Sequence, residues 1–142
     1  MQTFRAFAVL TLVLSFGFLR GIDEVSAATV CVVGGVTYPA TITGSGVIHG
    51  TNGNDVIYGS NSPDTIDGKD GDDIICGRGG ADIISGGEGN DAINGDSNID
   101  TIDGGNGNDT IYGGTSGDKL NGGTGSDVLS GGDGDDSLFG KS

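Results

Sequence analysis

Two patterns of apolar residues divide the chain. Residues 6–19 form an almost unbroken apolar run, AFAVLTLVLSFGFL. From Gly50 onward, a single Ile or Leu recurs every nine residues between neighbours of mixed polarity. Because successive residues of a β-strand point to opposite faces, each recurrence predicts a short strand with one buried side chain. The recurring residues are Ile57, Ile66, Ile75, Ile84, Ile93, Ile102, Ile111, Leu120, Leu129 and Leu138.

The apolar spacing belongs to a complete nine-residue repeat. Ten blocks follow one another from Gly50 without insertion, and each has Gly at position 1, Asp at position 6 and Ile or Leu at position 8. Three positions held in register through ten blocks predict stacked repeats rather than a disordered acidic segment. The opening glycines are Gly50, Gly59, Gly68, Gly77, Gly86, Gly95, Gly104, Gly113, Gly122 and Gly131.

The blocks resemble the pattern G-G-x-G-x-D-x-U-x of the RTX, or hemolysin-type, calcium-binding repeat. Residues 86–94, GGEGNDAIN, fit this pattern at every position. The resemblance implies an all-β fold, a right-handed parallel β-roll or β-solenoid, in which positions 1–6 form a turn and positions 7–9 a strand. Two blocks then make one coil. We expect about ten repeats over residues 50–142, preceded by a short N-terminal cap, a strand or hairpin, over residues 29–49.

Stacking the coils places Asp residues that are 18 apart above one another. Coils stack about 4.8 Å apart, and two carboxylates at that spacing repel by about 3–4 kcal/mol at an effective dielectric near 20. The thin Ile/Leu core does not compensate for this repulsion, so we expect a chain that is largely disordered without a cation. Carboxylate and carbonyl oxygens suit Ca²⁺, which tolerates irregular geometry, better than Mg²⁺.

The expected calcium ligands fall on two edges of the roll. Five Asp per edge allow up to about eight ions between coils. One edge carries Asp55, Asp73, Asp91, Asp109 and Asp127, together with the position-4 glycines Gly53, Gly71, Gly89, Gly107 and Gly125. The other edge carries Asp64, Asp82, Asp100, Asp118 and Asp136. On this second edge position 4 is Ser62, Asn98 or Ser116 in three blocks, and we expect weaker binding there because these residues resist the required backbone.

Charge and the N-terminal segment bear on location. The formal net charge is −14, with 20 Asp and Glu against 6 Lys and Arg. This charge excludes a nucleic-acid-binding protein and a protein that binds anionic lipid through a basic patch. Arg5, the apolar run and Ser26-Ala27-Ala28 predict a secretory signal peptide over residues 1–28, cleaved after Ala28 or, alternatively, after Ala27. The run is short for a membrane span, the competing interpretation, and no later segment looks transmembrane. We therefore expect a secreted protein.

The two cysteines, Cys31 and Cys76, both follow the predicted cleavage site. An even count in an exported chain favours a disulfide, because exported compartments are oxidising. Two small buried thiols are the alternative.

We expect no enzyme activity. His49 is the single histidine, and no nucleophile, base and acid occur together. The leading interpretation is a secreted calcium-binding repeat protein that folds on binding Ca²⁺. The alternative is a calcium-stiffened structural or adhesive module at a cell surface. The uncapped last coil also leaves end-to-end self-association open. The protein partner is left unassigned.

Overall fold

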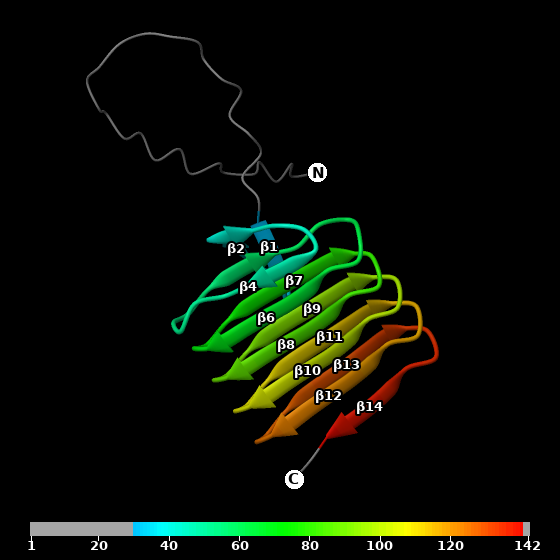
Figure 1. Ribbon diagram of the computed structural model, residues 1–142. Helices are drawn as coiled ribbons and strands as arrows, with labels where there is room; N and C mark the ends of the chain where they lie inside the picture. Colours follow the sequence, from blue (N-terminus) through cyan, green and yellow to red (C-terminus); the bar gives the residue numbers. More distant parts are fainter. Residues whose placement is uncertain (1–29, 141–142) are drawn as a thin grey trace, which may run out of the picture.

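A computed structural model describes residues 30–140, and the predicted signal segment with its cleavage site lies outside them. Over the described residues the chain forms an all-β solenoid of two parallel six-stranded sheets and one antiparallel hairpin (Figure 1). The odd sheet comprises β3 (Ile42–Thr43), β5 (Val56–Tyr58), β7 (Ile74–Gly79), β9 (Ala92–Ser97), β11 (Thr110–Thr115) and β13 (Val128–Asp133). The even sheet comprises β4 (Val47–His49), β6 (Thr65–Asp70), β8 (Ile83–Glu88), β10 (Thr101–Asn106), β12 (Lys119–Thr124) and β14 (Ser137–Gly140).

The strands pair in a register of 18 residues. Ile66 pairs with Ile84, and Ile84 with Ile102, so that equivalent residues of alternate blocks lie above one another. From β6 to β13 each strand has six residues and runs from position 7 of one block to position 3 of the next. The strands are thus longer than the three residues that the family pattern implies, because the Gly at position 1 continues the extended ladder instead of starting the turn. The turn is confined to positions 4–6.

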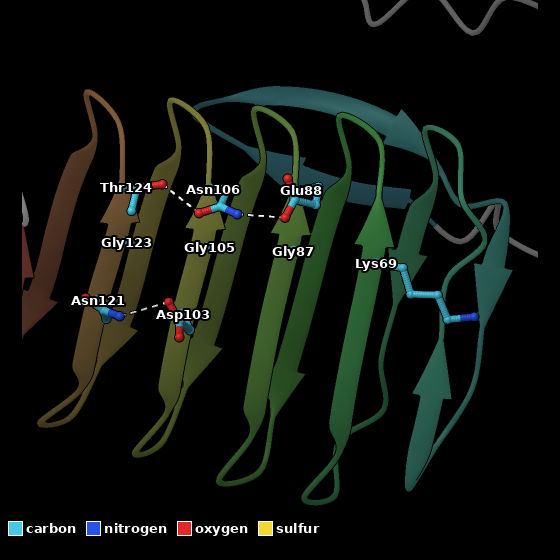
Figure 2. Close-up of a pocket in the computed structure, with 9 residues that line it drawn as sticks. All are labelled: Lys69, Gly87, Glu88, Asp103, Gly105, Asn106, Asn121, Gly123 and Thr124. Carbon is cyan, nitrogen blue, oxygen red and sulfur yellow. Dashed lines mark hydrogen bonds between the residues drawn. The ribbon is translucent and has the colours of Figure 1, made fainter.

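The outer face of the even sheet carries the exposed Val47 and Ile83 as well as polar residues, and it has a shallow groove lined by polar side chains and glycines (Figure 2). Glycines at position 2 leave its floor without side chains. Its side chains bond to each other between coils: the amide of Asn106 donates to Glu88 at 2.6 Å, and the Thr124 hydroxyl donates to Asn106 at 2.6 Å. Asn121 donates to Asp103 in the same way. These ladders reinforce the stacking of the coils.

The outer face of the odd sheet is instead covered by a hairpin. Strands β1 (Val30–Val33) and β2 (Val36–Pro39) pair antiparallel, and β1 lies against β5, β7 and β9. Cys31 is joined to Cys76 of β7 by a disulfide with a Cα–Cα distance of 5.5 Å. Most residues at positions 7 and 9 of the odd sheet are apolar beneath the hairpin, where Val56, Tyr58 and Ile74 pack in a small second core, and the polar Asn94 donates a hydrogen bond to Val32.

The segment 29–49, which the sequence analysis treats as one cap, has two parts in the structure. The hairpin covers a sheet face, whereas β3 and β4 already belong to the solenoid. Ile42 pairs with Ile57, and Ile48 pairs with Ile66. Ile48 lies in the core, as its spacing of nine residues from Ile57 indicates.

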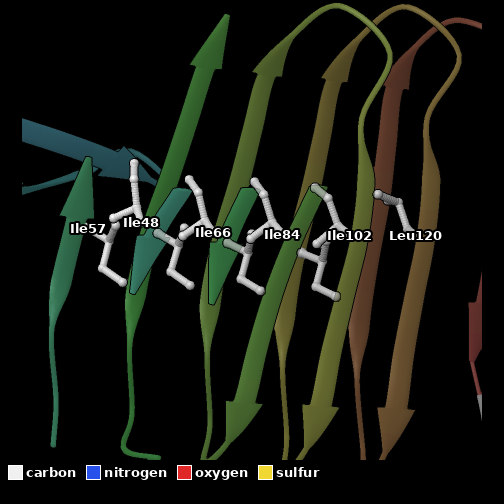
Figure 3. Packing of buried hydrophobic residues seen from close by; sticks show 9 residues of the cluster. Ile48, Ile57, Ile66, Ile84, Ile102 and Leu120 are labelled. Carbon is white, nitrogen blue, oxygen red and sulfur yellow. The ribbon is translucent and has the colours of Figure 1, made fainter. Parts of the chain in front are cut away.

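The main core is a ladder of single side chains between the two sheets (Figure 3). The position-8 residues from Ile57 to Leu120 are at most 1% exposed. Leu129 is partly buried, and Leu138 on the edge strand β14 is 46% exposed. The predicted ladder is therefore closed along its length and opens at the last coil, where β14 has a neighbour on one side.

Candidate metal centre

The Asp at position 6 of each block points into the solenoid. Positions 6, 8 and 1 alternate onto the inner face, so each Asp lies beside the core on the turn side. The six from Asp73 to Asp118 are at most 2% exposed. They form two columns, one at each edge of the solenoid, which we call the Asp55 column and the Asp64 column after their first members. The sequence places the same residues on the same two edges.

Backbone hydrogen bonds link each column from coil to coil. The Oδ1 of every Asp after the first in its column accepts the N–H of the Asp 18 residues earlier, at 2.8–3.0 Å. The pattern is the same in both columns. It fixes the orientation of each carboxylate and leaves its second oxygen to be satisfied otherwise.

That second oxygen, Oδ2, has no hydrogen-bond partner in most of the Asp residues of the two columns. Within the described residues, Oδ2 is buried without a hydrogen-bond partner in Asp73, Asp82, Asp91, Asp100, Asp109, Asp118 and Asp127. An unpaired buried carboxylate oxygen is costly. Burial raises the pKa of Asp91 and of Asp100 to about 7, and that of Asp73 to about 6. The backbone N–H opposes this shift, and the neighbouring Asp charges add to it. No positively charged side chain therefore stabilises the ionised form of these three carboxyl groups.

The opening glycines create the space beside these oxygens. A Cβ on Gly86 would meet Oδ2 of Asp91 and the carbonyl oxygen of Gly104 in the next coil, both at 2.5 Å or less. Gly104 stands in the same relation to Asp109 and Gly122. Position 1 thus brings a carbonyl oxygen and a carboxylate oxygen to the place that a side chain would occupy. These glycines are not among the ligand-forming residues expected from the sequence, although their recurrence in all ten blocks was the available signal.

The donor set fits a hard cation. Carboxylate and carbonyl oxygens face these spaces, and such oxygens bind Ca²⁺, whereas imidazole and thiolate select other metals. Among residues 30–140 no three or more His, Cys, Asp and Glu side chains cluster around one point. The residues that would hold calcium are instead successive Asp of one column, helped by backbone carbonyls of the glycine-rich turns.

The position-4 residues shape the turns. Gly71, Gly89, Gly107 and Gly125 of the first edge have φ between 118° and 133°, whereas Gly53 has open space around it and does not have a positive φ. On the second edge Asn98 and Ser116 adopt φ of 77° and 90°. These two residues take up the required backbone at a cost of about 1–2 kcal/mol each. Weaker binding on the second edge therefore stays a prediction.

His49 lies at the surface, with Nδ1 3.4 Å from Oδ2 of Asp67. In the stretch that the structure describes, no helix is long and apolar enough to cross a membrane.

Comparison with known proteins agrees with the geometry. The model of the RTX calcium-binding nonapeptide repeat matches in four copies, over residues 42–75, 49–84, 85–120 and 112–142. No curated protein and no solved structure matches the chain. RTX repeats bind calcium, and the stacked Asp of the turns are consistent with that. The match covers most of the chain, which therefore belongs to the RTX calcium-binding nonapeptide repeat family.

Proposed function

We propose that this protein is secreted and folds when Ca²⁺ binds between successive Asp-containing turns. The observation that carries the proposal is the set of seven buried Oδ2 atoms without a partner. A chain with this sequence encloses negative charge that nothing in its described part neutralises. A divalent cation would neutralise this negative charge and would be coordinated by oxygen atoms from two coils at once.

The proposal makes calcium part of the folding free energy. A binding site composed of successive coils does not exist in the unfolded chain, so the free energy of binding adds to that of folding. The ligands are the Asp of the two columns, and the glycines at position 1, together with the positive-φ glycines at position 4, let backbone carbonyls approach. In this proposal the chain performs no chemistry itself, and His49 is a surface residue.

Secretion follows from three properties of the chain. The first 28 residues have the composition of a signal peptide, RTX repeat proteins are typically secreted, and a disulfide joins two described segments. Disulfides persist in oxidising, extracellular environments. Such environments hold millimolar calcium, which would saturate weak extracellular sites with dissociation constants of about 10⁻⁴–10⁻³ M.

Circular dichroism with a calcium titration tests the proposal. We expect a much smaller β signal in excess chelator than at saturating Ca²⁺, and a cooperative gain of β signal as Ca²⁺ is added, with Mg²⁺ at the same concentration giving a much smaller gain. Asp91→Asn should raise the calcium concentration at the midpoint by about tenfold or more, equivalent to about 1.4 kcal/mol. It removes one charged ligand from the middle of the Asp55 column.

Asp103→Asn is the matched control. Asp103 is exposed on the even sheet, and Asn occupies the same block position at Asn94 and Asn121. The midpoint should stay unchanged, since the new side chain can still accept from Asn121. Full β signal in chelator with no response to Ca²⁺ would contradict the proposed function.

A further inference from the structure

The first two Asp of the columns differ from the others. Oδ2 of Asp55 accepts the backbone N–H of Thr51 at 2.6 Å and its hydroxyl at 2.9 Å. Oδ2 of Asp64 accepts the backbone N–H of Ser60 at 2.7 Å. All three bonds come from position 2 of the block to which the Asp belongs. These two carboxylates are therefore satisfied by the protein, whereas the seven that follow, from Asp73 to Asp127, are not.

The residue at position 2 explains the difference. In the next two blocks Lys69 and Arg78 hold this position at a φ of 80°, and in later blocks Asp96 or a glycine has a positive φ. Thr51 and Ser60 are not among the positive-φ residues. A β-branched Thr is poorly tolerated in the left-handed region. With an ordinary φ at position 2, the N–H faces the carboxylate instead of turning away.

The carboxylates have moved accordingly. A Cβ built on Gly50 or Gly59 would lie 3.1 or 2.9 Å from Oδ2 of its own Asp, against 2.5 Å or less in all later blocks. In the first two blocks Oδ2 is thus displaced from the opening glycine toward Thr51 or Ser60. The space beside position 1 is no longer lined by an unpaired carboxylate oxygen.

The same part of the molecule has additional support. The hairpin β1–β2 covers the outer face of the odd sheet at β5 and β7, and the disulfide fixes it there. The N–H of Gly46, in the loop before β4, donates to Oδ1 of Asp64. This bond repeats the one that the N–H of Asp64 makes to Asp82 in the next coil. In the first coil, the odd sheet is therefore packed on both faces, by the core and by the hairpin. The carboxylates of Asp55 and Asp64 are already hydrogen-bonded.

We infer that Thr51 and Ser60 take the place of calcium in the first coil. This inference rests on the proposed function. The first coil, from β3 to β6 with its hairpin, stays folded without calcium and serves as a template, and the calcium columns begin at Asp73 and Asp82. Each column of five Asp then has three calcium-binding intervals instead of four, so the protein binds about six ions rather than about eight.

Hydrogen exchange measured by mass spectrometry tests the inference on the wild-type protein. In excess chelator at neutral pH, amides of β1–β6 should exchange at least about tenfold more slowly than in urea, while amides of β9–β14 exchange as in urea. Calcium should then protect β9–β14. Uniformly fast exchange in chelator, followed by calcium-induced protection throughout, overturns the inference and leaves the proposed function intact. Uniformly slow exchange in chelator, unchanged by calcium, overturns the proposed function.

Variants connect the protection to position 2. Thr51→Gly combined with Ser60→Gly should abolish the protection of β3–β6 in chelator and raise the calcium stoichiometry by about two. Asn61→Gly, at an exposed site within the first coil where a later block has Gly79, is the control for the flexibility of an added glycine and should change neither. Thr51→Ser should retain the protection, since Ser also keeps an ordinary φ. Full protection in the double variant would contradict the role given to Thr51 and Ser60.

Discussion

At the scale of the residue, the buried carboxylate determines the properties of this protein. Each Asp after the first in its column uses one oxygen to bind the preceding coil, and most of these residues leave the other oxygen without a partner. Burial then favours the neutral form, which raises the pKa of Asp91 and Asp100 to about 7. Protons and calcium therefore compete for the same oxygens.

This competition gives a pH dependence of known sign. The folded, metal-free chain binds protons more tightly than the unfolded chain, whose Asp pKa is 3.8. Its stability is therefore fully present below about pH 4 and falls as the pH rises toward about 7. In chelator we expect the β signal to increase between pH 7.5 and pH 4.5. The calcium concentration at the midpoint of folding should also increase as the pH falls from 7.5 to 4.5, because protons compete for the same oxygens.

Circular dichroism in chelator at several pH values measures this dependence. A parallel series at high salt screens the exposed acidic side chains, whose repulsion also falls on acidification. The gain that remains at high salt belongs to the buried columns. A β signal in chelator that decreases from pH 7.5 to pH 4.5 would contradict the direction of the shift.

At the scale of the element, the nine residues of a block divide into strand and turn differently from the family pattern, because each strand extends to position 3 of the next block. Position 1 is both part of the strand and the wall of the candidate calcium space. Gly86→Ala should destabilise the calcium-loaded protein by about 1–3 kcal/mol, because its Cβ would overlap Asp91 and Gly104. Chemical denaturation at saturating calcium measures this free energy.

Gly53→Ala is the matched control for this substitution. Gly53 has nothing within 4 Å of an added Cβ and no positive φ, so Ala there should change the free energy of unfolding by less than about 0.5 kcal/mol. Equal losses in the two variants would show that glycine acts through chain flexibility and not through the space beside Asp91.

Much of this fold could be predicted from spacing alone. The recurrence of Ile and Leu identified the core from Ile57 to Leu120, and the 18-residue stacking identified both Asp columns. The outer faces could not be predicted in this way. Neighbours of mixed polarity at positions 7 and 9 indicated solvent exposure, yet Val56 and Ile74 are partly buried beneath the hairpin, whereas the equally apolar Ile83 on the even sheet is 58% exposed. Nor does a consensus reveal that Thr51 turns its N–H toward Asp55, since that depends on one φ angle.

At the scale of the whole molecule, the disulfide links the hairpin to the third block. It closes a loop with a sequence separation of 45, and the loop-entropy model assigns about 4 kcal/mol to such a closure. Cys31→Ser combined with Cys76→Ser should lower the free energy of unfolding at saturating calcium by about 2–4 kcal/mol. Urea denaturation of the variant and of the oxidised wild type measures the difference.

Reduction of the wild-type protein is the control for the two added hydroxyls. The reduced protein and the double variant should unfold at the same urea concentration, below that of the oxidised protein. An unchanged midpoint after reduction would mean that the hairpin holds through its apolar contacts with Tyr58 and Ile74 alone.

The 18-residue register also limits how such a chain can change in length. Excising residues 86–103 would remove one full coil and leave every remaining block on its original sheet, because neighbouring coils are equivalent. Excising nine residues would exchange the two sheets beyond the cut. With residues 86–94 removed, for example, Thr101 and Asn121 would take the places of Ala92 and Tyr112, which pack against the hairpin, and Tyr112 would move to the outer face of the even sheet. Growth or loss by pairs of blocks preserves both faces, and an odd number of blocks does not.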